Sequence, residues 1–267
     1  MMKLQVLIST MNLKNEQENK ELIKKMNIKI DSLTINQITQ KQIKETNDLK
    51  TQNKIISARE KGLSKSRNRA IQNSNADICI IADDDVKYKD NFEDIVKREY
   101  EKNKDYDMIC FFVECNGERK IKNMKTSRMC RIQAMRIRSF QITFKRSSIL
   151  SKNMKFDETF GPGTYFNRGE DTIFVWKCIE SGLKVKYVST KIADVEHGKS
   201  TWFKGFDDDF FAKQGRVFYE LSPKFYKLII WQFAIRKYKL YRKRLNIFQL
   251  VKIMNSEIEK GASNEKN

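Results

Sequence analysis

A continuous apolar run that ends in three adjacent carboxylates constrains the fold of this chain most. Residues 78–82 (ICIIA) lead directly into Asp83, Asp84 and Asp85. A run without polar alternation is typical of a strand buried on both faces of a parallel sheet. Adjacent carboxylates repel one another, so a cation or hydrogen bonds must offset their charge. Because ligands of open α/β sheets bind at the carboxyl ends of strands, the run predicts a ligand site there.

Short apolar runs alternate with polar, helix-favouring stretches along most of the chain. The predicted strands are residues 4–8, 30–35, 54–57, 78–82, 108–115, 139–144 and 183–187, and the predicted helices are 16–26, 64–73, 91–103 and 172–180. Ser64 is the predicted N-cap of the second helix, and Gly182 lies just past the end of the fourth. This alternation indicates an α/β layered fold. The basic, weakly patterned residues 117–138 predict a loop-rich insertion.

No composition shift marks a linker, so we expect an α/β domain over residues 1–215 and a helical extension over 216–267. The extension is rich in Lys, Arg and aromatic residues. It is either a helix packed on the domain or an interfacial helix that places aromatics among lipid headgroups and cations on anionic lipid. The N-terminus lacks signal-peptide features, and no apolar stretch reaches about 18 residues. We therefore expect a cytoplasmic protein, resting on the inner face of the plasma membrane if the extension binds lipid.

The formal net charge is +19, from 53 Lys and Arg against 34 Asp and Glu. Such a balance favours nucleic acid, acidic lipid or phosphorylated substrates as partners, or it is simply a solvated surface. A nucleic-acid-binding protein is one alternative, but the basic residues 119–138 have little aromatic interleaving, so we expect no nucleic acid partner. A metal-dependent nucleotidyltransferase is a second alternative, although no Gly-rich phosphate loop lies near the N-terminus.

The residues available for metal binding are carboxylates rather than thiolates. The five cysteines lack CxxC spacing, which argues against a disulfide framework and a zinc site and predicts buried free thiols. Asp83 and Asp85 would share a side of an extended segment. Carboxylate oxygens together with phosphate and water suit Mg²⁺ or Mn²⁺, and the alternative is a solvated acidic turn. A second acidic run at residues 207–209 follows no apolar strand, so we assign it to helix capping.

A second carboxylate pair, Glu170 and Asp171, opens the predicted helix that ends near Gly182. The helix dipole favours carboxylates in a first turn, so simple capping is one interpretation. The Gly-rich residues 160–169 (FGPGTYFNRG) come just before the pair and allow backbone to approach a ligand closely. The other interpretation is therefore a general base for a hydroxyl nucleophile.

Taken together, these segments resemble the glycosyltransferases of family 2. The matching segments in chain order are VLISTMN, GLSKSRNRAI, ADICIIADDDV, GEDTIFVWKCIESGLKV and HGKSTWFKG, which cover roughly residues 3–215. The resemblance implies the GT-A fold, a Rossmann-like α/β fold with a mixed, mostly parallel sheet flanked by helices. The short form without a membrane span resembles bacterial enzymes that assemble capsule, exopolysaccharide or lipopolysaccharide.

The resemblance implies an inverting transfer from a nucleotide-diphosphate sugar, a UDP-sugar in the first instance, to the hydroxyl of a saccharide acceptor, which could be lipid-linked. Asp171 matches the catalytic base and Glu170 its supporting neighbour. Asp83 and Asp85 match the DXD-type motif that holds Mn²⁺ or Mg²⁺ on the donor diphosphate, with Asp84 beside the donor.

The resemblance also implies a set of donor and acceptor contacts. Arg67 and Asn68 match an Arg-Asn pair near the nucleotide, and Ser9, Thr10 and Asn12 lie where the first strand meets the base and ribose. Many members carry an Asp at the end of the second strand that contacts the base. The equivalent residue in this chain is Asn36 or Gln37, whose amide is the implied base contact. His197 is implied as a further metal ligand, or it is a surface or core residue. Gly161, Gly163 and Trp202 are implied acceptor contacts, and Trp202 could equally be a core residue.

Overall fold

The protein is described by a computed structural model that covers residues 2–116, 123–196 and 205–264. The strands are β1 (Leu4–Met11), β2 (Ser32–Gln37), β3 (Thr46–Asp48), β4 (Asn53–Ala58), β5 (Ile78–Asp83), β6 (Val86–Tyr88), β7 (Met108–Asn116), β8 (Ser127–Arg128), β9 (Ile142–Lys145) and β10 (Val185–Glu196). The helices are α1 (Glu16–Lys25), α2 (Leu63–Asn73), α3 (Phe92–Lys102), α4 (Arg131–Ala134), α5 (Arg146–Ser151), α6 (Glu170–Glu180), α7 (Asp208–Leu221), α8 (Tyr226–Arg236), α9 (Tyr238–Tyr241) and α10 (Ile247–Asn264), with a 3₁₀ helix, η1 (Ser139–Gln141).

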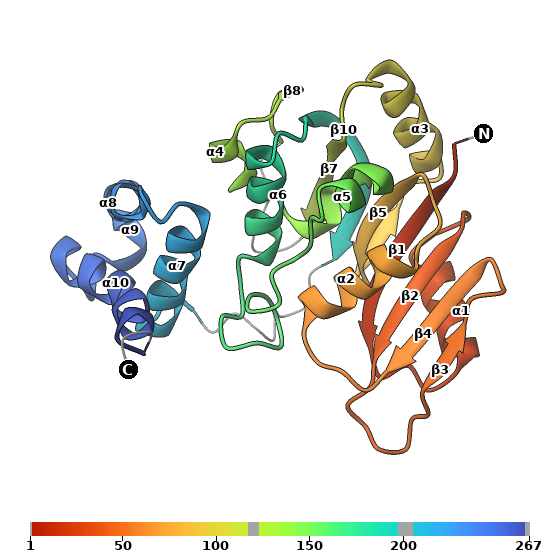
Figure 1. The fold of residues 1–267 in the computed structure, drawn as a ribbon, viewed down its shortest axis with the longest axis horizontal. Helices are drawn as coiled ribbons and strands as arrows, with labels where there is room; N and C mark the ends of the chain where they lie inside the picture. The colour runs from red at the N-terminus through yellow and green to blue at the C-terminus, as the bar shows by residue number, and fades with distance from the viewer. Residues whose placement is uncertain (1, 117–122, 197–204, 265–267) are drawn as a thin grey trace.

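Within these residues the strands form a ten-stranded mixed sheet in the order β3-β4-β2-β1-β5-β9-β7-β10-β6, with β8 beside β10 (Figure 1). The long pairings, β4 with β2, β2 with β1, β1 with β5 and β7 with β10, are parallel. The antiparallel pairings are short and involve β3, β6, β8 and β9. The α/β fold with a mixed, mostly parallel sheet is therefore confirmed.

Helices cover both faces of the sheet, which explains the unbroken apolar run in β5. On one face, Val6 and Ile8 of β1 pack with Ile23 of α1 and Val96 of α3. The other face packs against α2, α5 and α6. Side chains from alternate positions of a strand enter opposite cores, so both sets must be apolar. Because β4, β2, β1 and β5 are parallel neighbours, their carboxyl ends meet at one edge of the sheet.

The sequence signals for helix ends are mostly confirmed. The Asp207 side chain accepts a hydrogen bond from the Phe210 N–H, so the second acidic run does cap a helix. Gly182 has φ 91° and follows α6, where the N–H of Leu183 reaches the Cys178 carbonyl as in a Schellman motif. The expected N-cap at Ser64 is wrong, because α2 begins one residue earlier and Gly62 is the cap. The Ser64 hydroxyl is engaged elsewhere, as described below.

The sheet differs from the predicted one chiefly in its short strands. The expected strand at residues 139–144 begins as η1 and becomes the antiparallel strand β9. The expected strand at 183–187 is the start of the longer β10. The short strands β3, β6 and β8 were not expected, since three residues or fewer carry no detectable period. All five cysteines are free, as expected, although Cys130 is exposed rather than buried.

The helices α7–α10 lie at one end of the molecule next to α6 (Figure 1). Their buried residues, among them Phe211 and Leu250, belong to the same apolar cluster as Phe174 of α6. The expected boundary between residues 215 and 216 falls inside α7, so the division into two domains stays a prediction. In the described parts of the chain, none of the helices is long and apolar enough to cross a membrane.

We predict that Gly215→Ala destabilises the protein. Gly215 lies where α7 crosses α10, and a Cβ placed there would be 1.7 Å from the Met254 carbonyl oxygen. The clash should lower the free energy of unfolding by about 1–3 kcal/mol, although Gly→Ala within a helix normally has the opposite sign. Urea unfolding of G215A beside the half-buried neighbour variant Gln214→Ala measures this. An unchanged or raised midpoint for G215A would contradict the close crossing.

Candidate active site

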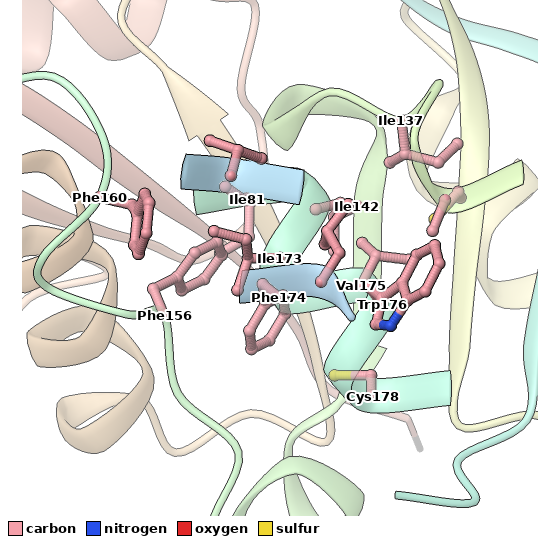
Figure 2. Close-up of a cluster of buried hydrophobic side chains, with 14 of the residues drawn as sticks. Ile81, Ile137, Ile142, Phe156, Phe160, Ile173, Phe174, Val175, Trp176 and Cys178 are labelled. Carbon is pink, nitrogen blue, oxygen red and sulfur yellow. The ribbon is translucent and has the colours of Figure 1, made fainter. Parts of the chain in front are cut away.

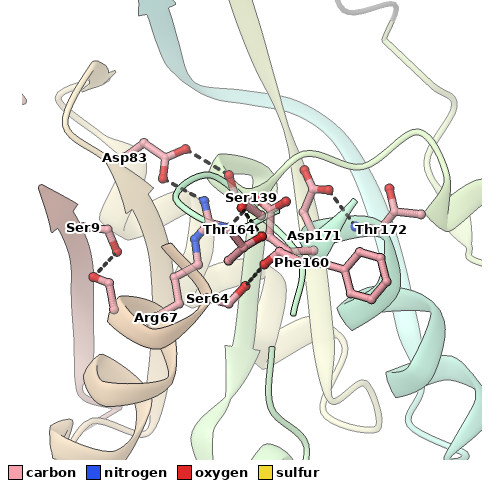
Figure 3. A network of polar contacts seen from close by, with 12 residues as sticks. Ser9, Ser64, Arg67, Asp83, Ser139, Phe160, Thr164, Asp171 and Thr172 are labelled. Atoms are coloured by element: carbon pink, nitrogen blue, oxygen red, sulfur yellow. Dashed lines mark hydrogen bonds and ion pairs between the residues drawn. The ribbon is translucent and has the colours of Figure 1, made fainter. Parts of the chain in front are cut away.

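A buried arginine joins the two acidic clusters. Arg67 of α2 is 1% exposed, and its Nη2 lies 2.8 Å from Oδ1 of Asp83 at the end of β5. Its Nη1 lies 3.1 Å from Oε1 of Glu170, which is 103 residues further along the chain at the start of α6. Figure 3 shows the guanidinium between the two elements. The carboxylates that the sequence places far apart therefore converge on one guanidinium.

Aromatic packing supports the buried guanidinium. Its carbon atom lies 5.3 Å from the centre of the Phe156 ring. Phe156 in turn stacks on Phe174 of α6 with centroids 4.0 Å apart and planes 11° apart. Figure 2 shows these rings among the apolar side chains of the core. Arginine is suited to such a position because its planar, weakly hydrated group can stack and donate at the same time.

The charges around Arg67 hold it in its protonated form. Burial alone would lower the pKa of Arg67, but the charges of Asp83 and Glu170 outweigh burial and the pKa is raised. Burial has the opposite sign for an acid. Burial and, second, the nearby charge of Asp171 raise the pKa of Glu170, Arg67 partly offsets both, and the resulting pKa is about 7.

Asp171 lies next to Glu170 in the first turn of α6 and is 9% exposed. Its Oδ1 accepts a hydrogen bond of 2.7 Å from the Thr172 N–H. Its second carboxylate oxygen accepts no hydrogen bond from any residue that the structure describes. Asp171 therefore differs from Glu170 in its partner, a backbone N–H instead of Arg67, and it has one oxygen available to receive a proton.

The three residues of the first cluster have different environments. Asp83 ends β5, and its Oδ2 accepts a hydrogen bond from the Ser139 hydroxyl (3.0 Å), so both of its oxygens are engaged. Asp84 accepts a hydrogen bond of 2.6 Å from the hydroxyl of Thr10 at the end of β1. Asp84 and Asp85 form the turn to β6, so the strand-like alternation expected for Asp83 and Asp85 stops at Asp83.

The donor set of this cluster fits a divalent cation that shares its coordination with a substrate. The described residues contain no group of three or more His, Cys, Asp or Glu side chains placed to hold an ion by themselves. Mg²⁺ and Mn²⁺ sites on phosphate substrates commonly use one or two carboxylates and take the remaining oxygens from phosphate and water. Asp83 accepts hydrogen bonds from Arg67 and Ser139, and the resemblance makes Asp85 the expected direct ligand; both metal contacts stay predictions.

The residues expected at the base and ribose lie together at the carboxyl ends of β1 and β2. The Ser9 hydroxyl accepts a 2.8 Å bond from Ser66 of α2. Asn12, with φ 58°, accepts hydrogen bonds from the backbone of Thr39 and Gln40. These residues fix the edge of the sheet around the expected donor position, and direct contact with a nucleotide stays a prediction.

The amides of Asn36 and Gln37 are used within the protein. Asn36 is fully buried, donates to the Leu13 carbonyl and to Ser57, and accepts from the Leu13 N–H. Gln37 donates to the Gly62 carbonyl at the start of α2. Both side chains therefore shape the segments around the site. A base contact through the Asn36 N–H groups would have to replace one of these bonds, and base contact by either residue stays a prediction.

The Gly-rich loop expected to meet the acceptor packs on the carboxylate pair. The Ser64 hydroxyl donates to the Phe160 carbonyl, which ties the loop to α2. Gly161 has φ 104°, and a Cβ there would lie 3.0 Å from Cγ of Glu170. A Cβ on Gly163 would lie 3.1 Å from the backbone of Gly62. Gly161 thus allows close approach to Glu170 and Gly163 close approach to the start of α2, and acceptor contact stays a prediction.

Asn68, the neighbour of Arg67, holds the segment that leads into this loop. Its Nδ2 donates to the carbonyl of Phe156 and to Glu158, and its Oδ1 accepts from the Phe156 N–H. Asn68 therefore positions the loop, and a nucleotide contact would have to replace one of these bonds. His197 and Trp202 lie outside the described residues, so their roles as metal ligand and acceptor contact stay predictions.

Sequence reasoning missed three residues that build the site. Ser139 binds Asp83, Phe156 lies against Arg67, and Glu158 binds Asn68. Ser139 opens a segment that looked like an ordinary strand, and residues 156–158 belong to a loop with no repeating pattern. No local signal singled these residues out, because their partners lie far away in the sequence.

The comparisons with known proteins decide the family. The family model described as "Glycosyl transferase family 2" matches residues 30–163. The chain belongs to glycosyl transferase family 2. The match includes Arg67, the three aspartates, Gly161 and Gly163, and it ends before Glu170 and Asp171. No curated protein sequence matches this glycosyltransferase.

Solved structures agree with the GT-A fold. A fragment of S. aureus TarS (1–349) in complex with UDP matches with a TM-score of 0.61 at 12% identity, covering 91% of this glycosyltransferase and 74% of that chain. The same fragment in complex with UDP-GlcNAc gives a TM-score of 0.62 at 12% identity with the same coverage. At this identity the likeness shows the fold alone.

We predict that Arg67→Met strongly destabilises this glycosyltransferase. The change leaves the carboxylates of Asp83 and Glu170 without their shared cation, which should cost about 3–5 kcal/mol. Arg69→Met is the matched control on the same helix. Arg69 pairs with Glu60 but its side chain is 41% exposed, so its loss should cost no more than about 1 kcal/mol. Urea midpoints that coincide for the two variants would show that the buried pairing is not formed.

We also predict a pH dependence that belongs to Glu170. Because its pKa is raised from 4.5 to about 7, the folded protein holds a proton there that the unfolded chain releases. Stability should therefore fall as pH rises through this window, by on the order of 1–3 kcal/mol relative to Glu170→Gln. Urea unfolding of both proteins at about pH 4.5 and about pH 7.5 measures the difference. If the wild type instead became more stable relative to Glu170→Gln as pH rises, the folded state would favour the charged form of Glu170.

Proposed function

We propose that this glycosyltransferase moves a sugar from a nucleotide-diphosphate sugar to an acceptor hydroxyl with inversion at the anomeric carbon. The observation that carries the proposal is the convergence of the β5 and α6 carboxylates on Arg67. It brings a diphosphate-binding end and a proton-accepting end into one site. The crystal structures of S. aureus TarS with UDP and with UDP-GlcNAc support a UDP-sugar as the first donor to test.

The donor would lie over the carboxyl ends of β1 and β5, with its diphosphate near Asp85. Asp85 would hold Mn²⁺ or Mg²⁺ there, with His197 as a further proposed ligand. The cation would neutralise charge on the leaving nucleoside diphosphate. Asp83 positions this end of β5 by its bonds to Arg67 and Ser139. Thr10 restrains Asp84 in the turn. These side chains set the shape of the site before the donor arrives, which lowers the entropy lost on reaction.

Asp171 would act as the general base. Its free carboxylate oxygen would take the proton of the acceptor hydroxyl as that oxygen attacks the anomeric carbon from the face opposite the leaving group. Each carboxylate has one oxygen engaged, Glu170 by Arg67 and Asp171 by the Thr172 N–H, so we assign the role to Asp171 from its match to the catalytic base of the family. The loop around Gly161 and Gly163 would border the acceptor. We propose a saccharide of a bacterial surface polysaccharide as the acceptor class.

We predict that Asp171→Asn lowers the rate of nucleotide release from a UDP-sugar by about 10²–10⁴-fold, because the amide cannot take the proton. The affinity for UDP, measured as thermal stabilisation by UDP in the presence of Mn²⁺, should stay near the wild-type value. Asp209→Asn, which changes a carboxylate that is 62% exposed on α7, serves as the control. Wild-type turnover in D171N would remove Asp171 from the role of base.

We predict that Asp85→Ala weakens the Mn²⁺-dependent part of UDP binding. Titration of UDP with and without EDTA should show a large effect of chelation on the wild type and a small one on D85A. Asp90→Ala, at an exposed surface pair with Lys29, is the control and should respond to EDTA as the wild type does. Equal UDP affinity in all arms would exclude a cation at Asp85.

A further inference from the structure

Four of the exposed large apolar side chains at the C-terminal end lie on α8 and α10. They are Leu228, Trp231 and Ile235 of α8 and Phe248 of α10, with exposures of 70%, 37%, 66% and 72%. We call them the C-terminal patch. Spacings of three and four place the α8 residues on one face of the helix. The Trp231 and Phe248 rings touch edge to face, with centroids 5.9 Å apart, so the two helices form one continuous surface.

The opposite face of α8 is already packed. Ile230, Phe233 and Ala234 are buried and belong to the core that includes α7 and α10. The C-terminal patch is therefore not the side by which α8 joins the fold. The interpretation of a helix packed on the domain is confirmed for this face, and the interfacial interpretation stays a prediction. An exposed apolar surface of this kind on a folded helix indicates an interaction site.

The surroundings of the C-terminal patch carry positive charge without compensation. From Leu221 to Ser256 the sequence has nine Lys and Arg and no Asp or Glu. All nine are exposed: Lys224, Lys227, Arg236, Lys237, Lys239, Arg242, Lys243, Arg244 and Lys252. Arg244 pairs with Asp208, and the other eight have no ion pair with a described residue. The excess charge of the chain is thus concentrated partly around an apolar surface.

We infer that the C-terminal patch and its cations bind the surface of an anionic lipid bilayer. Leu228, Ile235 and Phe248 can enter the boundary between headgroups and acyl chains, and Trp231 suits the headgroup layer. The cations gain about 1 kcal/mol each near an anionic surface. A bilayer is the partner that satisfies both parts of the surface, the apolar residues and the unpaired charges.

Two other occupants fit one part of this surface only. A second copy of the chain could cover the apolar residues, but a two-fold contact would bring the two sets of uncompensated cations together. A nucleic acid could neutralise the cations, but its phosphates would leave Leu228, Ile235 and Phe248 without a favourable contact. Both alternatives are outcomes of the test below.

The helix that carries Phe248 also contacts the loop beside the candidate active site. The hydroxyl of Tyr165, in the Gly-rich loop, donates to Glu257 of α10 at 3.2 Å. Lys213 of α7 lies 4.8 Å from the centre of the Tyr165 ring. Membrane binding would thus hold the acceptor loop near the bilayer, which suits a lipid-linked acceptor. This last step rests on the proposed function, so the test reads lipid binding alone.

The test is co-sedimentation of the full chain with vesicles of phosphatidylcholine, with and without phosphatidylglycerol. We expect binding to the anionic vesicles, weakened by added salt, and little binding to phosphatidylcholine alone. The apolar variant L228Q/I235Q/F248Q and the charge variant K227Q/R236Q/K243Q should both lose binding. Three fewer charges should lower the partition coefficient on the order of a hundredfold.

The matched control is K24Q/K25Q/K102Q, which removes three exposed lysines from the ends of α1 and α3 and should bind as the wild type does. Far-UV circular dichroism confirms that each variant is folded. Anionic-vesicle binding that the control loses as fully as the charge variant would overturn the proposal, because net charge alone would then suffice. Absence of vesicle binding would also overturn the proposal. Self-association that the apolar variant abolishes would then indicate a second copy of the chain, and nucleic acid binding that the apolar variant retains would indicate a nucleic acid.

Discussion

A single buried cation organises the candidate active site of this family 2 glycosyltransferase. Arg67 is charged and buried, so it needs anionic partners, and the carboxylates of Asp83 and Glu170 supply them. The pairing fixes the end of β5 relative to the start of α6. Its desolvation cost is offset only because all three groups meet with good geometry and Phe156 covers the guanidinium. The relative position of the two acidic clusters therefore depends on one helix, α2.

This arrangement divides the carboxylates by task. Asp83 and Glu170 are occupied by Arg67 and serve to position their neighbours. Asp171 follows Glu170 and Asp85 lies two residues beyond Asp83, and these are the residues we propose to meet proton and cation. The same division explains the raised pKa of Glu170, since burial penalises its charge more than Arg67 stabilises it. Neighbouring acids in one sequence motif thus have different environments because they point to different parts of the fold.

The C-terminal helices are continuous with the catalytic half of the molecule. They share its apolar core, and Gly215 allows α7 and α10 to cross at backbone contact. Tyr165 of the Gly-rich loop binds Glu257 of α10. The proposed membrane surface and the candidate active site are thus connected through packed elements rather than through a linker. A domain boundary could not be read from composition, because the helices that extend the fold are as apolar on their inner face as the core itself.

The sequence by itself determined the α/β class, most long strands and helices, and the two acidic clusters, because apolar period and helix-end chemistry are local properties. It also identified the family, through short motifs in a fixed order. Only the tertiary structure decided that Ser64 binds Phe160 instead of capping α2, that Asn36 is buried, and that Asp83 is held by Arg67 and Ser139. Those partners are distant in sequence, and the choice among polar partners is made by packing, which leaves no local pattern.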